Sequence, residues 1–124
     1  MGLMSEVRRV RGELTVKLLE FMRGRFSYEE GATLGEIVKA LYGVDNDRTR
    51  ARARVLISRV SRDLMAFGVT IVSAYKDQAA GHRYFIVGKP EDLENAIKYF
   101  TEYYLRNKEA AERRKAKEAD ESPT

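Results

Sequence analysis

Residues 33–67 read TLGEIVKALYGVDNDRTRARARVLISRVSRDLMAF, and this stretch contains the signals for two helices joined by a turn. Its first four residues, Thr33–Glu36, have the pattern of a capping box, in which the threonine hydroxyl and the glutamate carboxylate satisfy backbone donors at a helix start. Gly43 tolerates the left-handed conformation that ends a helix. The sequence therefore predicts a short helix between this box and Gly43. Its expected buried face consists of Ile37, Val38 and Leu41.

A second, longer helix is predicted after a tight polar turn. The turn spans Val44–Asp47, and we expect Asp47 to cap the next helix through its side-chain oxygen. Apolar residues then recur at spacings of one, three and four, which places them on one face of a helix. A short helix, a turn with glycine and a longer basic helix have the spacing of a helix-turn-helix. The expected buried face of the second helix consists of Ala53, Leu56, Ile57, Val60, Leu64 and Phe67.

The opposite face of this second helix carries a concentrated positive charge. Between Arg48 and Arg62 there are six arginines and no acidic residue. The whole chain has 23 Lys and Arg against 19 Asp and Glu, so without these six it has 17 against 19, a charge of −2. Charge gathered in this way indicates a surface for a polyanion. The face comprises Arg48, Ala51, Arg52, Val55, Ser58, Arg59 and Arg62.

A mixture of arginines with small and aliphatic residues is typical of a helix that enters the major groove of DNA. Guanidinium groups fit phosphate oxygens or guanine O6 and N7, a hydroxyl serves either role, and Val or Ala can contact thymine methyl groups. Two other interpretations stay open, a basic surface for a protein partner and a solvated helix face. A solvated face normally alternates the sign of its charges along i,i+4 pairs, and this face does not.

The elements on either side of this helix pair are predicted from periodicity. A first helix is expected from about residue 5 to residue 23, where apolar residues step by three and four. Residues 69–75 and 82–87 are rich in β-branched and aromatic residues, which predicts a β-hairpin. Residues 76–81 would form its loop, which is longer than a tight two-residue turn and is expected to project from the domain.

A last helix is predicted to open near Pro90, because proline suits the first turn of a helix. Tyr99 and Tyr103 lie well off its apolar stripe and form a second aromatic surface. Exposed aromatic residues on a terminal helix often form a dimer contact, so we expect a homodimer through these two tyrosines. The apolar stripe itself consists of Leu93, Ala96, Ile97, Phe100 and Tyr104.

The chain of 124 residues is expected to form one small domain. We place the domain at residues 1–107, including the packing and dimerisation helix from about residue 90, and a charged helical extension with a frayed tail at residues 108–124. The chain has no cysteine, which excludes disulfides and thiolate metal sites. No apolar run approaches the roughly 18 residues of a membrane helix. Residues 1–10 are charged instead of resembling a signal peptide, so a cytoplasmic location is expected.

This order of elements resembles the winged helix-turn-helix proteins, and the chain is similar to small archaeal or archaeal-virus transcription regulators. The resemblance covers residues 5–104 and rests on the helix pair and the hairpin quoted above. It implies a mainly α fold of three helices and a small antiparallel β-hairpin, the wing, here followed by a long C-terminal helix. The first strand of the family's small sheet is barely visible near residues 26–33. The sheet is therefore expected to have two strands, or a poorly formed third.

The family resemblance also assigns roles to residues. It implies a recognition helix at Arg48–Met65 in the major groove and a wing at Lys76–Arg83 near the DNA backbone or minor groove. Val55 and Ser58 would lie nearest the groove floor, and Arg50 and Arg54 at the flanks would hold phosphates or form ion pairs. Phosphate and base-edge contacts are expected from Arg48, Arg52, Arg59 and Arg62, and wing contacts to the DNA backbone from Lys76, His82 and Arg83.

The function expected from the sequence is duplex DNA binding by a homodimer, with a role in transcription regulation and without a metal or small-molecule cofactor. An enzyme is not expected, because the chain has one histidine, no cysteine and no Gly-rich phosphate loop. A winged-helix adaptor that binds proteins is the first alternative. RNA binding is the second, and Tyr75 and Tyr84 of the hairpin are its best support.

Overall fold

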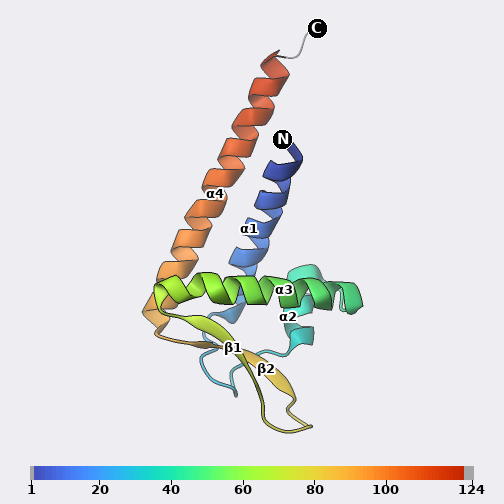
Figure 1. The fold of residues 1–124 in the computed structure, drawn as a ribbon, viewed down its shortest axis with the longest axis vertical. Helices are drawn as coiled ribbons and strands as arrows, with labels where there is room; N and C mark the ends of the chain where they lie inside the picture. Colours follow the sequence, from blue (N-terminus) through green and yellow to red (C-terminus); the bar gives the residue numbers. More distant parts are fainter. Residues whose placement is uncertain (1, 122–124) are drawn as a thin grey trace.

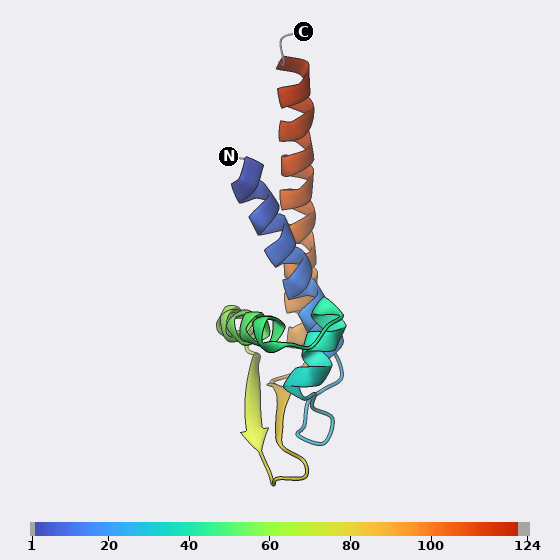
Figure 2. The same cartoon turned by 90° about the vertical axis from the view of Figure 1, so that its right-hand side faces the viewer.

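The structure, a computed structural model, describes residues 2–121, with side chains over residues 12–117. It is mainly helical with one two-stranded antiparallel sheet, as the sequence predicted. Figures 1 and 2 show the arrangement from two directions. The elements are α1 (Gly2–Met22), α2 (Leu34–Tyr42), α3 (Asp47–Leu64), a single 3₁₀ turn η1 (Met65–Phe67), β1 (Thr70–Tyr75), β2 (His82–Val87) and α4 (Pro90–Glu121).

Helices α1 and α4 lie side by side and antiparallel, and they rise together from the body of the protein (Figures 1 and 2). The two helices approach each other closely at Gly12, where a Cβ atom would lie 2.8 Å from Cδ2 of Tyr104. At the same contact, the Tyr104 hydroxyl donates a hydrogen bond of 2.7 Å to the carboxylate of the neighbouring residue Glu13. Helix α3 crosses the lower part of this pair, and the hairpin extends below α3 on the side away from the chain ends.

The core lies where α3 meets α1, α2, the hairpin and the first turns of α4. The predicted buried face of α3 is confirmed, because its apolar residues from Ala53 to Leu64 are buried and Phe67 is half-buried. Ile37, Val38 and Leu41 of α2 are buried as predicted. Fully buried side chains come from every layer and include Leu18, Leu19, Ile37, Val60, Leu64, Ile86 and Leu93.

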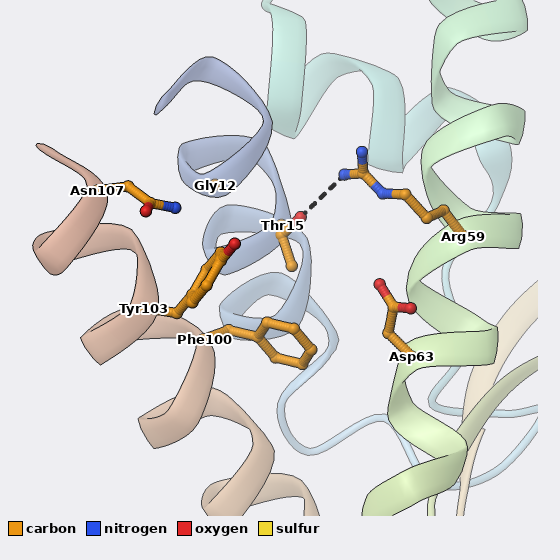
Figure 3. A pocket seen from close by; sticks show the side chains of 7 residues that line it. All are labelled: Gly12, Thr15, Arg59, Asp63, Phe100, Tyr103 and Asn107. Atoms are coloured by element: carbon orange, nitrogen blue, oxygen red, sulfur yellow. Dashed lines mark hydrogen bonds between the residues drawn. The ribbon is translucent and has the colours of Figure 1, made fainter. Parts of the chain in front are cut away.

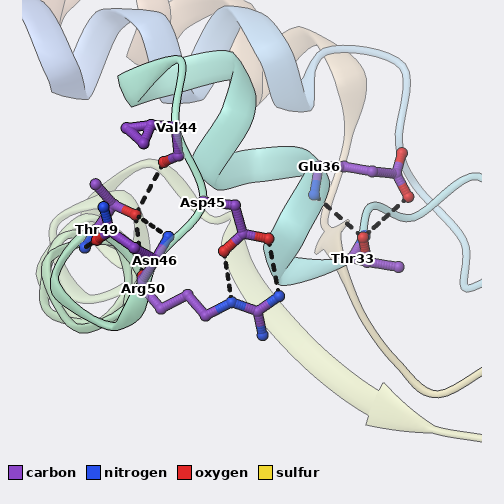
Figure 4. A network of polar contacts seen from close by, with 7 residues as sticks. All are labelled: Thr33, Glu36, Val44, Asp45, Asn46, Thr49 and Arg50. Atoms are coloured by element: carbon purple, nitrogen blue, oxygen red, sulfur yellow. Dashed lines mark hydrogen bonds and ion pairs between the residues drawn. The ribbon is translucent and has the colours of Figure 1, made fainter.

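The start of α2 is the predicted capping box, but the start of α3 differs from the prediction (Figure 4). The cap of α3 is Asn46 instead of Asp47, which is already the first helical residue. Asn46 Oδ1 accepts from the Thr49 backbone N–H at 2.9 Å, and Thr49 Oγ1 accepts from the Asn46 backbone N–H at 3.0 Å. If Asp47 were the cap, its backbone N–H would have to donate to the side chain three positions on. That side chain is Arg50, whose guanidinium can only donate and cannot accept.

The hairpin has the predicted strands and loop. Thr70 pairs with Val87 at its base and Tyr75 pairs with His82 at its end, so the loop spans residues 76–81. The third strand is reduced to a single bridge, in which Ala32 and Tyr84 exchange backbone hydrogen bonds of 2.9 and 2.8 Å. This bridge ties the connection between α1 and α2 to the sheet and confirms the expectation of a poorly formed third strand.

Helix α4 continues without interruption across residues 107 and 108 to Glu121. Beyond that residue the expected frayed tail lies outside the described residues. None of the helices described within residues 2–121 is long and apolar enough to cross a membrane.

We predict that Asn46→Ala lowers the free energy of unfolding by about 1 kcal/mol, because it removes the side-chain acceptor at the start of α3. The measurement is urea unfolding followed by circular dichroism. Asp47→Ala is the matched control, since Asp47 is exposed and only adds a favourable charge to the first turn. A larger loss from Asp47→Ala than from Asn46→Ala would show that the cap is assigned to the wrong residue.

Candidate nucleic-acid interface

The face of α3 opposite the core is exposed along the whole helix. Near its middle, Val55 is 71% exposed, a high value for an aliphatic side chain. No described part of the chain covers this residue, so the helix presents an apolar side chain within a basic surface. We call this surface the basic face. It consists of Arg48, Ala51, Arg52, Val55, Ser58 and Arg62, all of them exposed.

The six arginines of α3 divide into two groups. Arg48, Arg52, Arg54 and Arg62 have no carboxylate within ion-pair distance among the side chains of residues 12–117. Their charges therefore act outward on solvent and on any approaching polyanion. The remaining two arginines, Arg50 and Arg59, are engaged inside the protein.

Arg50 fastens the turn before α3. Its Nε and Nη2 donate to the two carboxylate oxygens of Asp45 at 2.6 and 2.9 Å, in a bidentate pair (Figure 4). These hydrogen bonds, together with the attraction between the charges, lower the pKa of Asp45 and raise the pKa of Arg50. Of the two roles predicted for Arg50, phosphate binding or an ion pair, the structure contains the ion pair.

Arg59 turns from the basic face toward α1. Its side chain is half-buried, and Nη2 donates a hydrogen bond of 3.1 Å to Oγ1 of Thr15 (Figure 3). The sequence pattern predicts an outward-facing Arg59, because its backbone position lies at the edge of that face. A long side chain at such an edge can extend over the exposed face or toward the neighbouring helix, and the sequence periodicity does not indicate which.

Two of the three hairpin residues predicted to contact the DNA backbone are engaged with the connection between α1 and α2. Lys76 Nζ lies 3.5 Å from a carboxylate oxygen of Glu29 and 5.7 Å from the ring centre of Tyr28. Arg83 lies over the same ring at 5.2 Å and donates to the Glu29 carbonyl at 3.3 Å. The Tyr28 hydroxyl in turn donates to the Gly81 carbonyl at 2.7 Å. Sequence reasoning missed Tyr28, because nothing in its local pattern indicates a partner more than 50 residues away.

His82 occupies a different position from the other two hairpin residues. Its ring contacts the exposed ring of Tyr75 at a tilt of 47°, with the ring centres 5.0 Å apart. It also lines a groove of about 580 Å³ between the hairpin, the start of α2 and α3. Arg54 and Ser73 line the same groove, so the structure brings the predicted residues His82 and Arg54 to one place.

The two tyrosines predicted for dimerisation extend an aromatic cluster on α4. Tyr99 and Tyr103 are 46% and 47% exposed, and their rings stack with centres 6.4 Å apart. Tyr99 also contacts the rings of Phe67 and Phe100 at 5.5 and 5.3 Å. Each ring therefore has one side packed on the protein and another side exposed.

Among the described residues, no group of three His, Cys, Asp or Glu side chains is arranged to hold a metal ion. A comparison of the chain with protein-family models, with curated proteins and with solved structures found no match.

We predict that Asp45→Asn lowers the melting temperature at pH 7 and that the loss shrinks below about pH 4. The pKa of Asp45 is lowered in the folded protein, so its ion pair stabilises the fold above the unfolded pKa, and this contribution is lost as the pH falls through the folded pKa. Melting of both proteins across this range measures the difference. The exposed residue Glu112, changed to Gln, is the control. A loss that stayed constant down to about pH 2 would contradict this role of the pair.

Proposed function

We propose that this protein binds duplex DNA through the basic face of α3. The observation that carries the proposal is the combination, on one exposed face, of Val55 and Ser58 with arginines that have no ion-pair partner among the side chains of residues 12–117. The residues on the other side of the same helix are buried, so this face is presented rigidly and needs no rearrangement of the backbone to bind.

The dimensions and chemistry of α3 suit a major groove. Its 18 residues give a length of about 27 Å at the usual rise per residue. A major groove about 12 Å wide admits one α-helix. In this position Arg48, Arg52 and Arg62 would reach phosphates or guanine edges, while Val55 and Ser58 would face the groove floor.

The hairpin would contact the flanking DNA backbone only through its side that borders α3. The groove shared by Arg54, Ser73 and His82 opens between α3 and the hairpin, where a phosphate backbone leaving the major groove would pass. Lys76 and Arg83 already interact with Glu29 and Tyr28, so we expect weaker contributions from them.

The fold that we propose is a winged helix-turn-helix, with α2 and α3 as the helix pair and the hairpin as the wing. The order of elements and the single bridge at Ala32 are compatible with that arrangement. We further propose a cytoplasmic transcription regulator that acts as a homodimer, with Tyr99 and Tyr103 at the contact. A two-fold dimer would place two basic faces on successive half-sites of one duplex.

The test is the salt dependence of binding to a labelled random duplex, with a matched single strand measured in parallel. We predict that Arg52→Ala weakens duplex binding and lowers the slope of log K against log salt by about 0.9, the value for one lost phosphate contact. Arg59→Ala should lower the slope less, because its guanidinium is directed toward Thr15. Fluorescence anisotropy at several salt concentrations measures both slopes.

Arg113→Ala is the control for charge alone, since Arg113 is a highly exposed arginine on the distal part of α4. If it lowered the slope as much as Arg52→Ala, the contact would not be specific to α3. Stronger binding to the single strand would favour RNA or single-strand recognition through Tyr75, which is 53% exposed. No binding at low salt would favour the protein adaptor.

A further inference from the structure

A cleft of about 370 Å³ lies on the opposite edge of α3 from the hairpin groove, where α1, α3 and α4 meet (Figure 3). It is separate from the basic face, and the proposed DNA contact does not use it. The side chains that matter for its chemistry are Thr15 of α1, Arg59 and Asp63 of α3, and Phe100, Tyr103 and Asn107 of α4.

Arg59 is the group in this cleft that is suited to bind an anionic ligand. Arg59 is half-buried as a residue, and its guanidinium donates a hydrogen bond to the neutral hydroxyl of Thr15. Within residues 12–117, whose side chains are described, no carboxylate lies within ion-pair distance of it, although Asp63 is one turn further along the same helix. A guanidinium has five N–H donors in a planar fork that matches a carboxylate. Arg59 therefore has donors available for an anion that enters the cleft.

The wall across from Arg59 is aromatic. Phe100 is half-buried and Tyr103 stands at the rim, both on α4 and both lining the cleft (Figure 3). The volume lies near the lower end of the range for small-molecule sites, about 300 to 1,000 Å³. The cleft thus combines a cation with an apolar surface at a size that suits one ring and a short chain.

Asp63 limits the charge that the cleft accepts. Its carboxylate faces the same space as the Arg59 guanidinium (Figure 3). A ligand with two or more negative charges, such as a phosphate ester, would be repelled by this carboxylate. A ligand with one negative charge would be repelled less, and an added ammonium group that Asp63 could bind would offset the repulsion.

We infer that this cleft binds a small molecule that has a carboxylate and an aromatic ring. The carboxylate pairs with the Arg59 guanidinium, and the ring packs against Phe100 and Tyr103. Two kinds of compound share this chemistry, a simple aromatic acid and an aromatic amino acid. Asp63 distinguishes them, because only the amino acid has an ammonium group for its carboxylate to bind.

The experiment is isothermal titration of the full chain with three probes, 3-phenylpropionate, phenylalanine and phenethylamine. We expect at least one of the two carboxylates to bind and the amine, which lacks a carboxylate, to bind at least tenfold more weakly. Arg59→Gln should weaken the carboxylate probe at least tenfold. Lys17→Gln, an exposed lysine of α1 outside the cleft, is the charge-matched control and should leave binding unchanged.

Asp63→Asn then separates the two kinds of ligand. This variant should weaken the binding of phenylalanine, and it should leave the binding of 3-phenylpropionate unchanged or make it tighter. Melting curves establish that each variant is folded, and Arg59→Lys, which keeps the charge but loses the planar fork, replaces Arg59→Gln if that variant unfolds.

Two results would overturn this inference. The first is that neither carboxylate binds at millimolar concentration, and the second is that binding is the same in wild type and Arg59→Gln. None of these measurements contains DNA, so their failure is distinct from a failure of the proposed DNA contact.

Discussion

The structure depends on one constraint, that α3 must be buried along one face and exposed along the other. Residues from Ala53 to Leu64 fix the helix in the core, where Val60 and Leu64 are completely buried. Because the apolar residues occupy one side of a period of 3.6, every arginine of the helix is directed to the other side or to its edges. The position of the charge is therefore a consequence of the packing, and loss of the core would also disperse the basic face.

The two edges of α3 differ in what they meet. One edge faces the hairpin and the start of α2, where Arg50 is held by Asp45 and Arg54 borders an open groove. The other edge faces α1 and α4, where Arg59 reaches Thr15 across the cleft. A ligand bound at Arg59 would contact the same rigid helix that carries the basic face. Binding at one of these two places would change the affinity at the other only if the ligand changed the position or the order of α3.

Much of the fold could be predicted from the sequence because its signals are local. The capping box at Thr33, the glycine stop at Gly43 and the change of period at the hairpin each depend on residues a few positions apart. The prediction places the cap of α3 one residue too late, because Asn46 and Asp47 are both good capping residues. Only the side chain three positions on distinguishes them, Thr49 for Asn46 and Arg50 for Asp47.

The site could be predicted less completely, because its details depend on contacts between distant segments. Lys76 and Arg83 interact with Tyr28, and Arg59 interacts with Thr15, and none of these pairs is close in sequence. Long cationic side chains at the edge of a face can adopt several rotamers, and the backbone period does not choose among them. The central residues of the basic face, including Val55, follow directly from the period and lie where the pattern predicted.

The most direct test of the central claim is a ¹⁵N–¹H NMR titration of the full chain with duplex DNA. We expect the amide shifts to concentrate in α3 and at the hairpin groove near Ser73 and His82, while the distal part of α4 at residues 108–117 stays unchanged. Shifts confined to the distal part of α4, or no shifts at low salt, would show that the basic face of α3 is not the DNA-binding surface.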